Sequence, residues 1–494
     1  MTTSVTGGSA TNITAAQVEE SLRRRPVRHL LGGKLIQTKG FFPVINPTTG
    51  EVCAQCVDAT PDLLDEAIAS ARDAQPAWGD TPVGERRAAL LQLASVLRTN
   101  CDELAGLITL EQGKPLGAAR MEVARAAMLV EQFVQLEIEP ERLRDDASGR
   151  VEVHYRPLGV VGAITPWNMP LVLSVPKIAH ALYAGNALVL KPSPYTPLAT
   201  LRLAELAFEH FPAGVLNVLA GGNPLGQWMS EHPGIDKISF TGSIATGRRV
   251  MASASGSLKR LTLELGGNDP AIILPDADIE AIAQALFDAA FVNCGQVCMA
   301  IKRLYVHEHL YEEACERLAA IARSVTVGDP FAPETKMGPL QNRAQFDIVQ
   351  SILHDTRRQP GVRILAGGQA MARPGYFVQP TVVANIAEGT RLVDEEPFGP
   401  VLPIIAYSDV NDAIARANRS VYGLGASVWG SDEARASEIA LQLHAGTVWV
   451  NRHMGADPLA PFGGARQSGI GRQYGITGLR GYMEGVTLFL PPRR

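Results

Sequence analysis

Apolar and polar positions follow two different patterns along the chain, and the pattern changes near residue 158. Between residues 61 and 135, apolar residues recur at i, i+3 and i+4 spacing, which predicts a run of helices. From residue 158 on, short Val/Ile/Leu runs such as GVVGAIT (159–165) and NALVLKPS (186–193) alternate with helical stretches and are separated by Gly or Pro. This alternation is typical of a doubly wound α/β sheet with parallel strands.

A second α/β block begins at LTLELGG (261–267) and ends at GTVWVN (446–451). A chain of 494 residues exceeds what one hydrophobic core usually organises, so more than one domain is expected. We predict a nucleotide-type domain from residues 21–143 and 158–262, a second domain from 263–447, and a disordered lead-in over 1–20. Residues 144–157 and 448–494 should form a β-ribbon and a C-terminal tail that pair with another subunit.

Composition indicates an ordinary globular protein. Hydrophobic residues make up 46% of the chain and charged residues 19%, and the formal net charge of −5 gives no general attraction to nucleic acid or anionic lipid. The most apolar region, residues 158–175, is interrupted by Pro166, Asn168 and Pro170, so it is expected in a core and not in a membrane. The N-terminal stretch has neither the apolar segment of a signal peptide nor the arginines of a transit peptide, which predicts a cytoplasmic protein.

Metal sites and disulfides are not expected. Six cysteines in a chain of this length do not make a disulfide framework. Cys53 and Cys56 match CxxC, but they lie in a Val/Ala-rich segment without a second CxxC, so a strand carrying two small thiols is favoured. His307 and His309 have no third ligand at a matching spacing, and we assign no metal.

The segment FTGSIATGRR (240–249) predicts a phosphate contact. A strand end passes through a glycine-spaced turn into a helix, whose free amides and Ser243 suit a phosphate. Arg248 and Arg249 stand where a P-loop needs Lys and Ser/Thr, and GxGxxG is missing, so neither ATP hydrolysis nor the usual dinucleotide fingerprint is supported.

Three residues outside this turn could carry acyl chemistry. In FVNCGQVCMA (291–300), Cys298 falls on or just after a glycine turn, where a thiol can be exposed, although a packed thiol is the commoner role for a lone cysteine. Glu264 on the strand before two glycines could act as a general base, or simply pair with a lysine. Asn168 between two prolines could donate to an oxyanion, or belong only to a rigid loop. Spacing alone does not show that the three meet.

With these residues together, the chain resembles the NAD(P)-dependent aldehyde dehydrogenase superfamily from about residue 40 to its end. Eight short motifs stand in family order: EQGKP (111–115), PWNMP (166–170), LKPSPYTP (190–197), FTGS (240–243), LELGG (263–267), FVNCGQVC (291–298), EEPFGP (395–400) and PFGGARQSGIGR (461–472). The resemblance implies an α/β fold with a Rossmann-type cofactor domain, a doubly wound catalytic domain and an oligomerisation ribbon. It also implies a homodimer or homotetramer.

The resemblance assigns roles to individual residues. Cys298 corresponds to the nucleophile, Glu264 to the general base, and Asn168 with the Cys298 backbone amide to the oxyanion hole; Cys294 is then a spare packed thiol. Lys177 corresponds to a member of an auxiliary proton relay, which is in doubt here because Gln473 replaces a frequent glutamate. The expected cofactor-binding residues are Ile164, Thr165, Pro166, Trp167, Lys191, Ser193, Pro194, Gly226, Phe240, Thr241, Gly242, Ser243, Thr246, Leu265, Gly266, Glu396 and Phe398. Among these, Glu396 corresponds to the nicotinamide-ribose contact and Phe398 to a residue beside the nicotinamide, while Trp167 is expected near the cofactor.

The motifs leave the choice between NAD and NADP open. Many NAD-preferring relatives carry a glutamate three residues after the KP-motif lysine, where it binds the adenine-ribose diol, but this chain has Pro194. Without that carboxylate a 2′-phosphate is not repelled, and Ser193 could bond to it, so NAD is only slightly favoured. Asn268 replaces the lysine common in ELGGK, which we interpret as a subfamily trait.

The substrate is expected to be an aldehyde that bears a bulky apolar or aromatic group. Positions where many relatives carry aromatic rings hold small or aliphatic residues here, and the remaining wall is apolar, although His453 or Arg303 could still reach in. The expected pocket residues are Met169, Pro176, Val292, Val297, Met299, His453, Ala456 and Phe462.

Three alternatives to oxidation of an aldehyde to the free acid remain at this stage. A coenzyme A-acylating semialdehyde dehydrogenase shares the fold, but that branch usually lacks the glutamate at position 264. A catalytically silent structural relative would not need Cys298, Glu264 and Asn168 together. A plain Rossmann-type binding module would need the phosphate turn but none of the catalytic groups.

Overall fold

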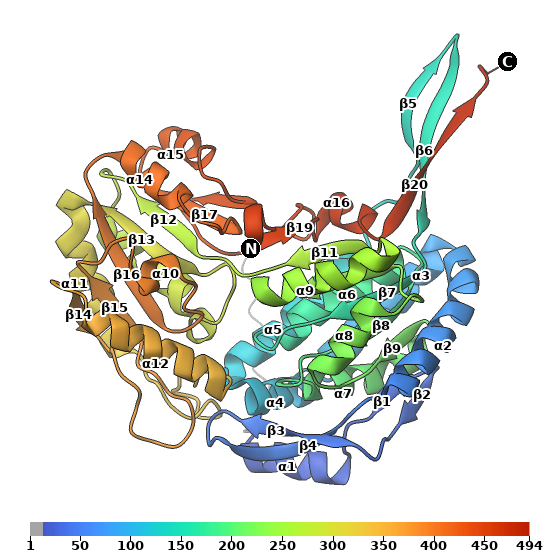
Figure 1. Cartoon of the computed structure of the whole chain (residues 1–494), viewed down its shortest axis with the longest axis horizontal. Coiled ribbons are helices and arrows are strands. Elements are labelled where there is room, and N and C mark those ends of the chain that lie inside the picture. Colours follow the sequence, from blue (N-terminus) through green and yellow to red (C-terminus); the bar gives the residue numbers. More distant parts are fainter. Residues whose placement is uncertain (1–12, 494) are drawn as a thin grey trace, which may run out of the picture.

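The computed structural model describes residues 13–493, which form two α/β units side by side and a β-ribbon that projects beyond the first unit (Figure 1). The first unit is built on an eight-stranded sheet whose central strands run parallel. In spatial order its strands are β19 (Gly469–Ile470), β11 (Arg260–Glu264), β10 (Lys237–Thr241), β7 (Val160–Ile164), β8 (Ala187–Lys191), β9 (Leu216–Val218), β1 (His29–Leu31) and β2 (Lys34–Ile36).

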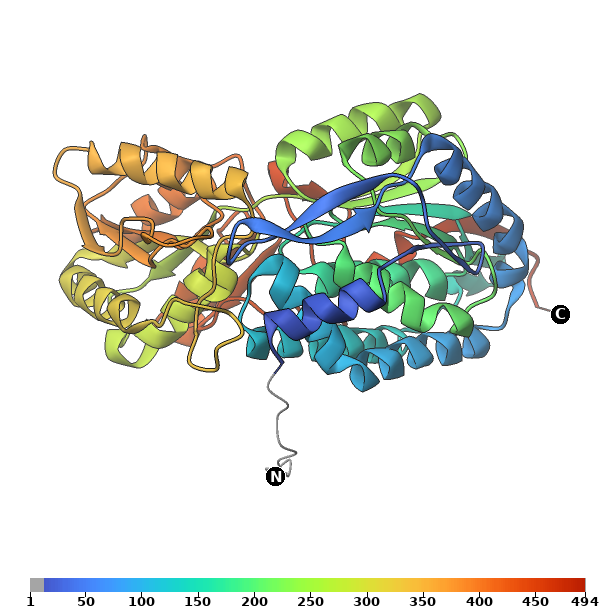
Figure 2. The same cartoon turned by 90° about the horizontal axis from the view of Figure 1, so that it is seen from below.

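Both faces of this sheet are covered by helices, which explains why its strands are continuous apolar runs. Within β7, Val160 packs into one buried cluster and its neighbour Val161 into another, as the period of two in a strand requires. The helices of this unit are α2 (Pro61–Asp80), α3 (Val83–Thr99), α4 (Cys101–Gln112), α5 (Leu116–Phe133), α6 (Pro170–Tyr183), α7 (Leu198–Ala207), α8 (Asn223–Glu231) and α9 (Ile244–Ala254). Figure 2 shows α2, α8 and α9 above the sheet and the remaining helices of this list below it.

The second unit holds a seven-stranded sheet that is parallel except for β14. Its spatial order is β14 (Arg363–Ala366), β15 (Thr381–Ala384), β16 (Val401–Tyr407), β13 (Ile301–His307), β12 (Asp269–Ile273), β17 (Gly425–Trp429) and β18 (Thr447–Val450). Its helices are α10 (Ile279–Phe291), α11 (Tyr311–Ser324), α12 (Arg343–Arg357), α13 (Arg391–Asp394), α14 (Val410–Asn418) and α15 (Glu433–Ala440). The doubly wound α/β fold expected from the apolar runs is thus confirmed in both units.

The ribbon joins segments from distant parts of the chain. β5 (Glu141–Asp146) and β6 (Gly149–Pro157) form a hairpin, and β20 (Met483–Leu490) pairs with β6 over its whole length. The proposed domain boundaries need small shifts: the hairpin begins at Glu141, β18 extends the second sheet past residue 447, and β19 returns to the first sheet. The short helix α16 (Gly475–Arg480) precedes β20.

A disordered lead-in over residues 1–20 is wrong for its last part, and residues 1–12 lie outside the described residues. Helix α1 (Ala15–Arg24) begins with a capping box in which Thr14 Oγ1 accepts from Gln17 N and Gln17 accepts from Thr14 N. Val18 and Leu22 are buried on its inner face.

The two cysteines of the CxxC segment lie on β4 (Glu51–Val57), which pairs with β3 (Phe41–Asn46). Among residues 13–493, no helix is both long and apolar enough to cross a bilayer.

Candidate active site

The strand order of the first sheet creates a switch point between β7 and β10. The next two strands in sequence, β8 and β9, lie on one side of β7, whereas β10 and β11 lie on the other. The register pairs Ile164 with Lys191 and Thr241 with Glu264, so the carboxyl ends of these strands meet at one edge. In open parallel sheets, ligands bind in the crevice outside this edge. The residues expected to bind cofactor and the expected base therefore start from the same edge.

The turn after β10 has the features of a phosphate site. Ser243 caps α9: its Oγ accepts from Thr246 N at 3.2 Å and donates to Thr246 Oγ1 at 3.0 Å. A Cβ on Gly242 would lie 2.5 Å from the Phe240 ring, so this turn needs glycine. The buried hydroxyl of Thr241 has no hydrogen-bond partner. An unsatisfied hydroxyl beside free helix amides fits the pyrophosphate of a dinucleotide.

Lys191, Ile164 and Gly226 lie together beside this turn. A Cβ on Gly226 of α8 would lie 3.8 Å from both Ile164 Cδ1 and Lys191 Cδ. Lys191 Nζ donates to Pro192 O at 3.2 Å, and burial lowers the pKa of Lys191 to about 8. Ser193 Oγ accepts from Tyr195 N at 3.3 Å. These positions fit an adenosine ribose, and no carboxylate stands at position 194.

Two glycines after β11 allow another carboxylate to approach. A Cβ on Gly266 would lie 2.2 Å from Glu396 Oε2, and Gly267 N donates to Glu396 Oε1 at 3.2 Å. Next to Glu396 in the chain, the Phe398 ring meets the Trp167 ring edge-on, with centroids 5.3 Å apart. Glu396 and Phe398, which the resemblance places at the nicotinamide ribose and the nicotinamide, thus lie close to the end of β11, and Trp167 contacts Phe398. The residues present fit the nicotinamide half of a dinucleotide.

The nucleophile turn is shaped by backbone in the left-handed region. Helix α10 ends at Phe291, after which Asn293, Cys294 and Gly295 all have positive φ. A Cβ on Gly295 would lie 2.2 Å from Gly399 O, so the turn packs closely against the EEPFGP loop. Cys298 follows the turn and is half-buried, and burial raises the pKa of its thiol to about 12. Lys302 opposes this rise, whereas the charges of Glu396, Asp269 and Glu264 add to it.

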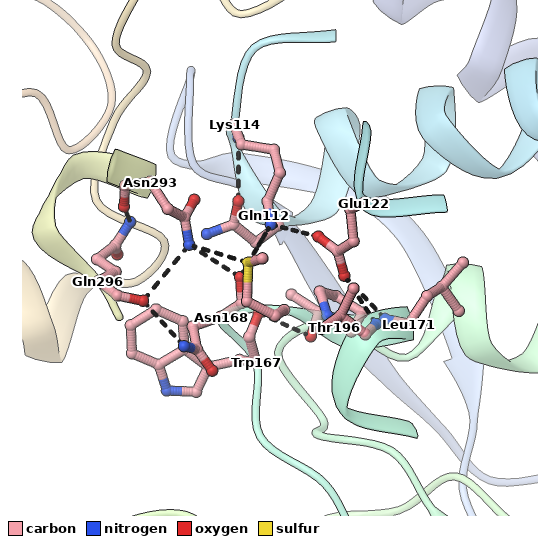
Figure 3. Close-up of polar contacts among 12 residues, drawn as sticks. Gln112, Lys114, Glu122, Trp167, Asn168, Leu171, Thr196, Asn293 and Gln296 are labelled. Carbon is pink, nitrogen blue, oxygen red and sulfur yellow. Dashed lines mark hydrogen bonds and ion pairs between the residues drawn. The ribbon is translucent and has the colours of Figure 1, made fainter. Parts of the chain in front are cut away.

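The Asn168 loop is held from two sides (Figure 3). Asn168 Nδ2 donates to Gln296 O at 2.9 Å, which ties the amide to the turn that carries Cys298. Asn168 O accepts from Asn293 Nδ2 at 2.9 Å and from Lys114 Nζ at 3.1 Å. Since an amide nitrogen has two hydrogens, Asn168 Nδ2 keeps one for a ligand.

Glu264 is buried and neither of its oxygens has a hydrogen-bond partner. Burial raises its pKa, while the charges of Lys177 and Arg472 partly offset that rise. Lys177 is also fully buried; burial lowers its pKa, and its Nζ donates to Ser239 Oγ at 3.1 Å. A carboxylate with free lone pairs near a thiol suits a general base.

A cavity of about 1220 Å³ lies beside the turn that carries Cys298. Cys298 itself does not line it, but the next residue, Met299, does, and so does Cys294. Six methionines contribute to the wall: Met121, Met128, Met169, Met299, Met337 and Met454. Phe287, Phe291, Trp449, Phe462 and Tyr474 add aromatic surface, and Arg125, Asp288, Lys336, Arg452 and Asp457 add charged groups.

Five of the eight expected pocket residues line the cavity, namely Met169, Val292, Met299, Ala456 and Phe462. Pro176 and Val297 are buried outside this wall. His453 does not reach in, because its ring nitrogens bond Ser427 Oγ at 2.8 Å and Met299 O at 3.0 Å. Arg303 is held in the second unit by its bonds to Asn268 O and Ala417 O.

Two buried lysines were not among the expected site residues. Lys114 pairs with Glu122, which in turn accepts from Leu171 N at 2.9 Å. The position of Lys114 in the EQGKP motif could have indicated its place at the site. Lys302 Nζ donates to the backbone oxygens of Val297 and Cys298 and pairs with Glu396. Nothing in the sequence around Lys302 indicates these contacts.

A phosphate-type turn at a switch point, together with a thiol, an amide and a carboxylate without a hydrogen-bond partner, is typical of nucleotide-dependent oxidoreductases. The particular family follows from comparison with known proteins. The model of the aldehyde dehydrogenase family matches residues 36–488. The chain therefore belongs to the aldehyde dehydrogenase family and is an oxidoreductase, and a cofactor of NAD or NADP is consistent with that family.

Relatives match along nearly the whole chain. A phenylacetaldehyde dehydrogenase from Pseudomonas fluorescens is 40% identical over 478 residues, which are 93% of this chain and 95% of the relative. An aldehyde dehydrogenase from Enchytraeus buchholzi is 38% identical over 91% of this chain and 92% of its own. The NAD+ complex of an aldehyde dehydrogenase from Bacillus cereus superposes with a TM-score of 0.93 at 34% identity, covering 96% of this chain and 98% of that one.

Proposed function

We propose that the protein oxidises an aldehyde bearing a bulky apolar or aromatic group to the carboxylic acid, with NAD+ or NADP+ as oxidant. The observation that carries the proposal is a large, methionine-rich cavity beside the turn that leads to Cys298. Asn168 bonds Gln296 O of this turn, and the charge of Glu264 acts on the pKa of the Cys298 thiol, which supports the proposed roles of all three residues. Met side chains adapt to irregular apolar groups and make favourable contacts with aromatic rings. The similarity to a phenylacetaldehyde dehydrogenase supports the same substrate class.

Cys298 acts as the nucleophile. Because burial keeps its thiol protonated, the proton passes to Glu264 as Sγ bonds to the carbonyl carbon. The free hydrogen of Asn168 Nδ2 and the Cys298 amide stabilise the oxygen of the thiohemiacetal. The nicotinamide, when bound, supplies the hydride acceptor that converts this adduct to a thioester.

Glu264 then acts on water. Once the thiol proton has left Glu264 for solvent, its unpartnered oxygens can accept a proton from a water that attacks the thioester carbon. That proton then passes to Sγ as the C–S bond breaks, and the acid is released. Its presence favours hydrolysis over transfer of the acyl group to coenzyme A. Lys177 holds positive charge near the carboxylate and modulates its pKa.

A panel of aldehydes assayed separately with NAD+ and NADP+ tests the proposal. We expect kcat/KM for phenylacetaldehyde and long-chain aldehydes to exceed that for acetaldehyde and for a short carboxylate-bearing semialdehyde, and coenzyme A to leave turnover unchanged. A strong preference for the short semialdehyde would contradict the substrate class. NAD+ should be used at least as well as NADP+, because no cationic group replaces the missing carboxylate at Pro194 itself.

The ribbon supports a homodimer or homotetramer. β5 and β20 are the outer strands of its three-stranded sheet, and Leu143, Leu488 and Phe489 are exposed on it. Outer strands with exposed apolar side chains favour pairing with a second copy. Analytical ultracentrifugation of the full chain tests the assembly, and a monomer would contradict it.

The six free thiols suit a reducing compartment such as the cytoplasm.

A further inference from the structure

Lys302 uses all three hydrogens of its side-chain nitrogen within the active site. Its side chain is 3% exposed, and it lies on β13, four residues after Cys298. Nζ lies 2.8 Å from Val297 O, 2.6 Å from Cys298 O and 3.1 Å from Glu396 Oε1. Since an ammonium has three donors, these contacts fix the position of the lysine head completely.

The two carbonyls belong to the peptide groups on either side of the Cys298 Cα. The Val297 carbonyl shares a planar trans peptide with the Cys298 N–H, which is the proposed oxyanion donor. A bond from Lys302 to that carbonyl therefore sets the direction of the N–H. The bond to Cys298 O fixes the following peptide, so the nucleophile is anchored from both sides.

The surroundings explain why a cation stands here. Burial raises the pKa of Glu396 and raises that of Asp269 to about 7. For each of these carboxyl groups, the positive charge of Lys302 is the largest effect that opposes the rise. Within the described part of the chain, no side chain donates a hydrogen bond to Asp269, and Asn268 donates to Val393 O and brings no charge. Gly267 provides the space: a Cβ there would lie 2.6 Å from Cys298 O.

We propose that Lys302 is a positioning residue that connects the ribose-binding carboxylate of Glu396 to the backbone of Cys298. This rests on the proposed function, in which Cys298 attacks the aldehyde, and on the assignment of Glu396 to the nicotinamide ribose. A change in the position of Glu396 moves Lys302, and through it the two peptides of the nucleophile. Cofactor binding and thiol reactivity are therefore linked by one side chain.

The test compares thiol reactivity without turnover. The rate of alkylation of Cys298 by iodoacetamide is measured against pH, with and without NAD+, in a Cys294→Ala background and by mass spectrometry of the Cys298 peptide. The groups whose charges act on this thiol or respond to it are Lys302, Glu264, Asp269, Glu396 and the Tyr474 phenol. Lys302→Met should shift the alkylation midpoint to higher pH, reduce the rate at pH 7.5 on the order of tenfold, and abolish the response to NAD+.

Lys237→Met is the matched control. Lys237 is equally buried on β10, but its Nζ bonds Thr262 Oγ1 at 2.7 Å and does not contact the nucleophile turn. This variant should keep both the alkylation midpoint and the NAD+ response. Lys302→Arg should recover part of the NAD+ response, because it keeps the charge while changing the geometry.

A second variant covers the case in which Lys302→Met does not fold. Lys302→Met/Glu396→Gln removes both charges of the pair, so the midpoint should shift less, whereas the NAD+ response should still be lost. A wild-type NAD+ response in either variant would overturn the proposal. Failure of the wild-type enzyme to oxidise any aldehyde would instead overturn the proposed function, because alkylation does not depend on turnover.

Discussion

Replacement of Gly267 by alanine should damage catalysis by moving the nucleophile's backbone. A Cβ at this position would lie 2.6 Å from Cys298 O, 2.7 Å from Asp269 Oδ1 and 2.9 Å from Leu424 Cβ. Ordinary contact begins at 3.4 Å, so the Cys298 carbonyl would have to recede by roughly 0.8 Å, the difference between 3.4 and 2.6.

Two effects of different size follow from this displacement. Overpacking at a buried site costs about 1–3 kcal/mol of folding free energy. A misplacement of about 1 Å in a reacting group can lower the rate by about 10²-fold, which equals about 2.7 kcal/mol of activation free energy. We therefore expect Gly267→Ala to fold, with a lower free energy of unfolding, and to show a kcat about 10²-fold below wild type.

Steady-state kinetics and urea unfolding of the purified variant measure both effects. Gly84→Ala is the control, because Gly84 lies in α3 with nothing within 4 Å of an added Cβ, and alanine there should stabilise the helix by about 0.5–1 kcal/mol without changing kcat. A Gly267→Ala enzyme with wild-type kcat would refute the close approach of the Cys298 carbonyl to this glycine.

Three further outcomes are expected. Gly266→Ala, whose Cβ would lie 2.2 Å from Glu396 Oε2, should weaken NAD+ binding, measured by fluorescence titration, more than it lowers the rate of the bound enzyme. Asn168→Ala should lower kcat by about 10²–10³-fold while NAD+ still binds, since it removes one oxyanion donor; an unchanged kcat would exclude that role. The third outcome concerns Glu264, which accepts a proton only when it is ionised. Because burial raises its pKa, the hydrolysis-limited kcat should rise with pH through a midpoint above the ordinary range of a glutamate, and a flat profile would contradict this. By the same reasoning, Glu264→Gln should accumulate acyl-enzyme.

The parallel sheets were predictable because buried strands leave a local signal. Runs such as GVVGAIT and NALVLKPS became β7 and β8 within one or two residues, since burial on both faces demands continuous apolar residues. Strand ends are also local, so the placement of Lys191 and Glu264 at one edge follows from the fold class. The capping box of α1 was equally local, yet the polar composition of the N-terminal stretch concealed it.

Contacts between segments that are distant in the sequence had no such signal. Lys302 and Glu396 lie 94 positions apart, and their ion pair depends on how β13 and the EEPFGP loop meet. His453 was expected to reach into the pocket, but bonds to Ser427 Oγ and Met299 O hold it inside the second unit. A pattern of residue types cannot reveal which way such a side chain turns.

The most direct test of the account is to locate the covalent intermediate. Enzyme mixed with NAD+ and phenylacetaldehyde is quenched in acid within one turnover, and its peptides are analysed by mass spectrometry. We expect an acyl group on Cys298 alone, and we expect it to be retained in Cys294→Ala. In Cys298→Ala both the acyl group and NADH formation should be absent. Acylation of Cys294, the thiol that lines the cavity, or NADH formation by Cys298→Ala would contradict it.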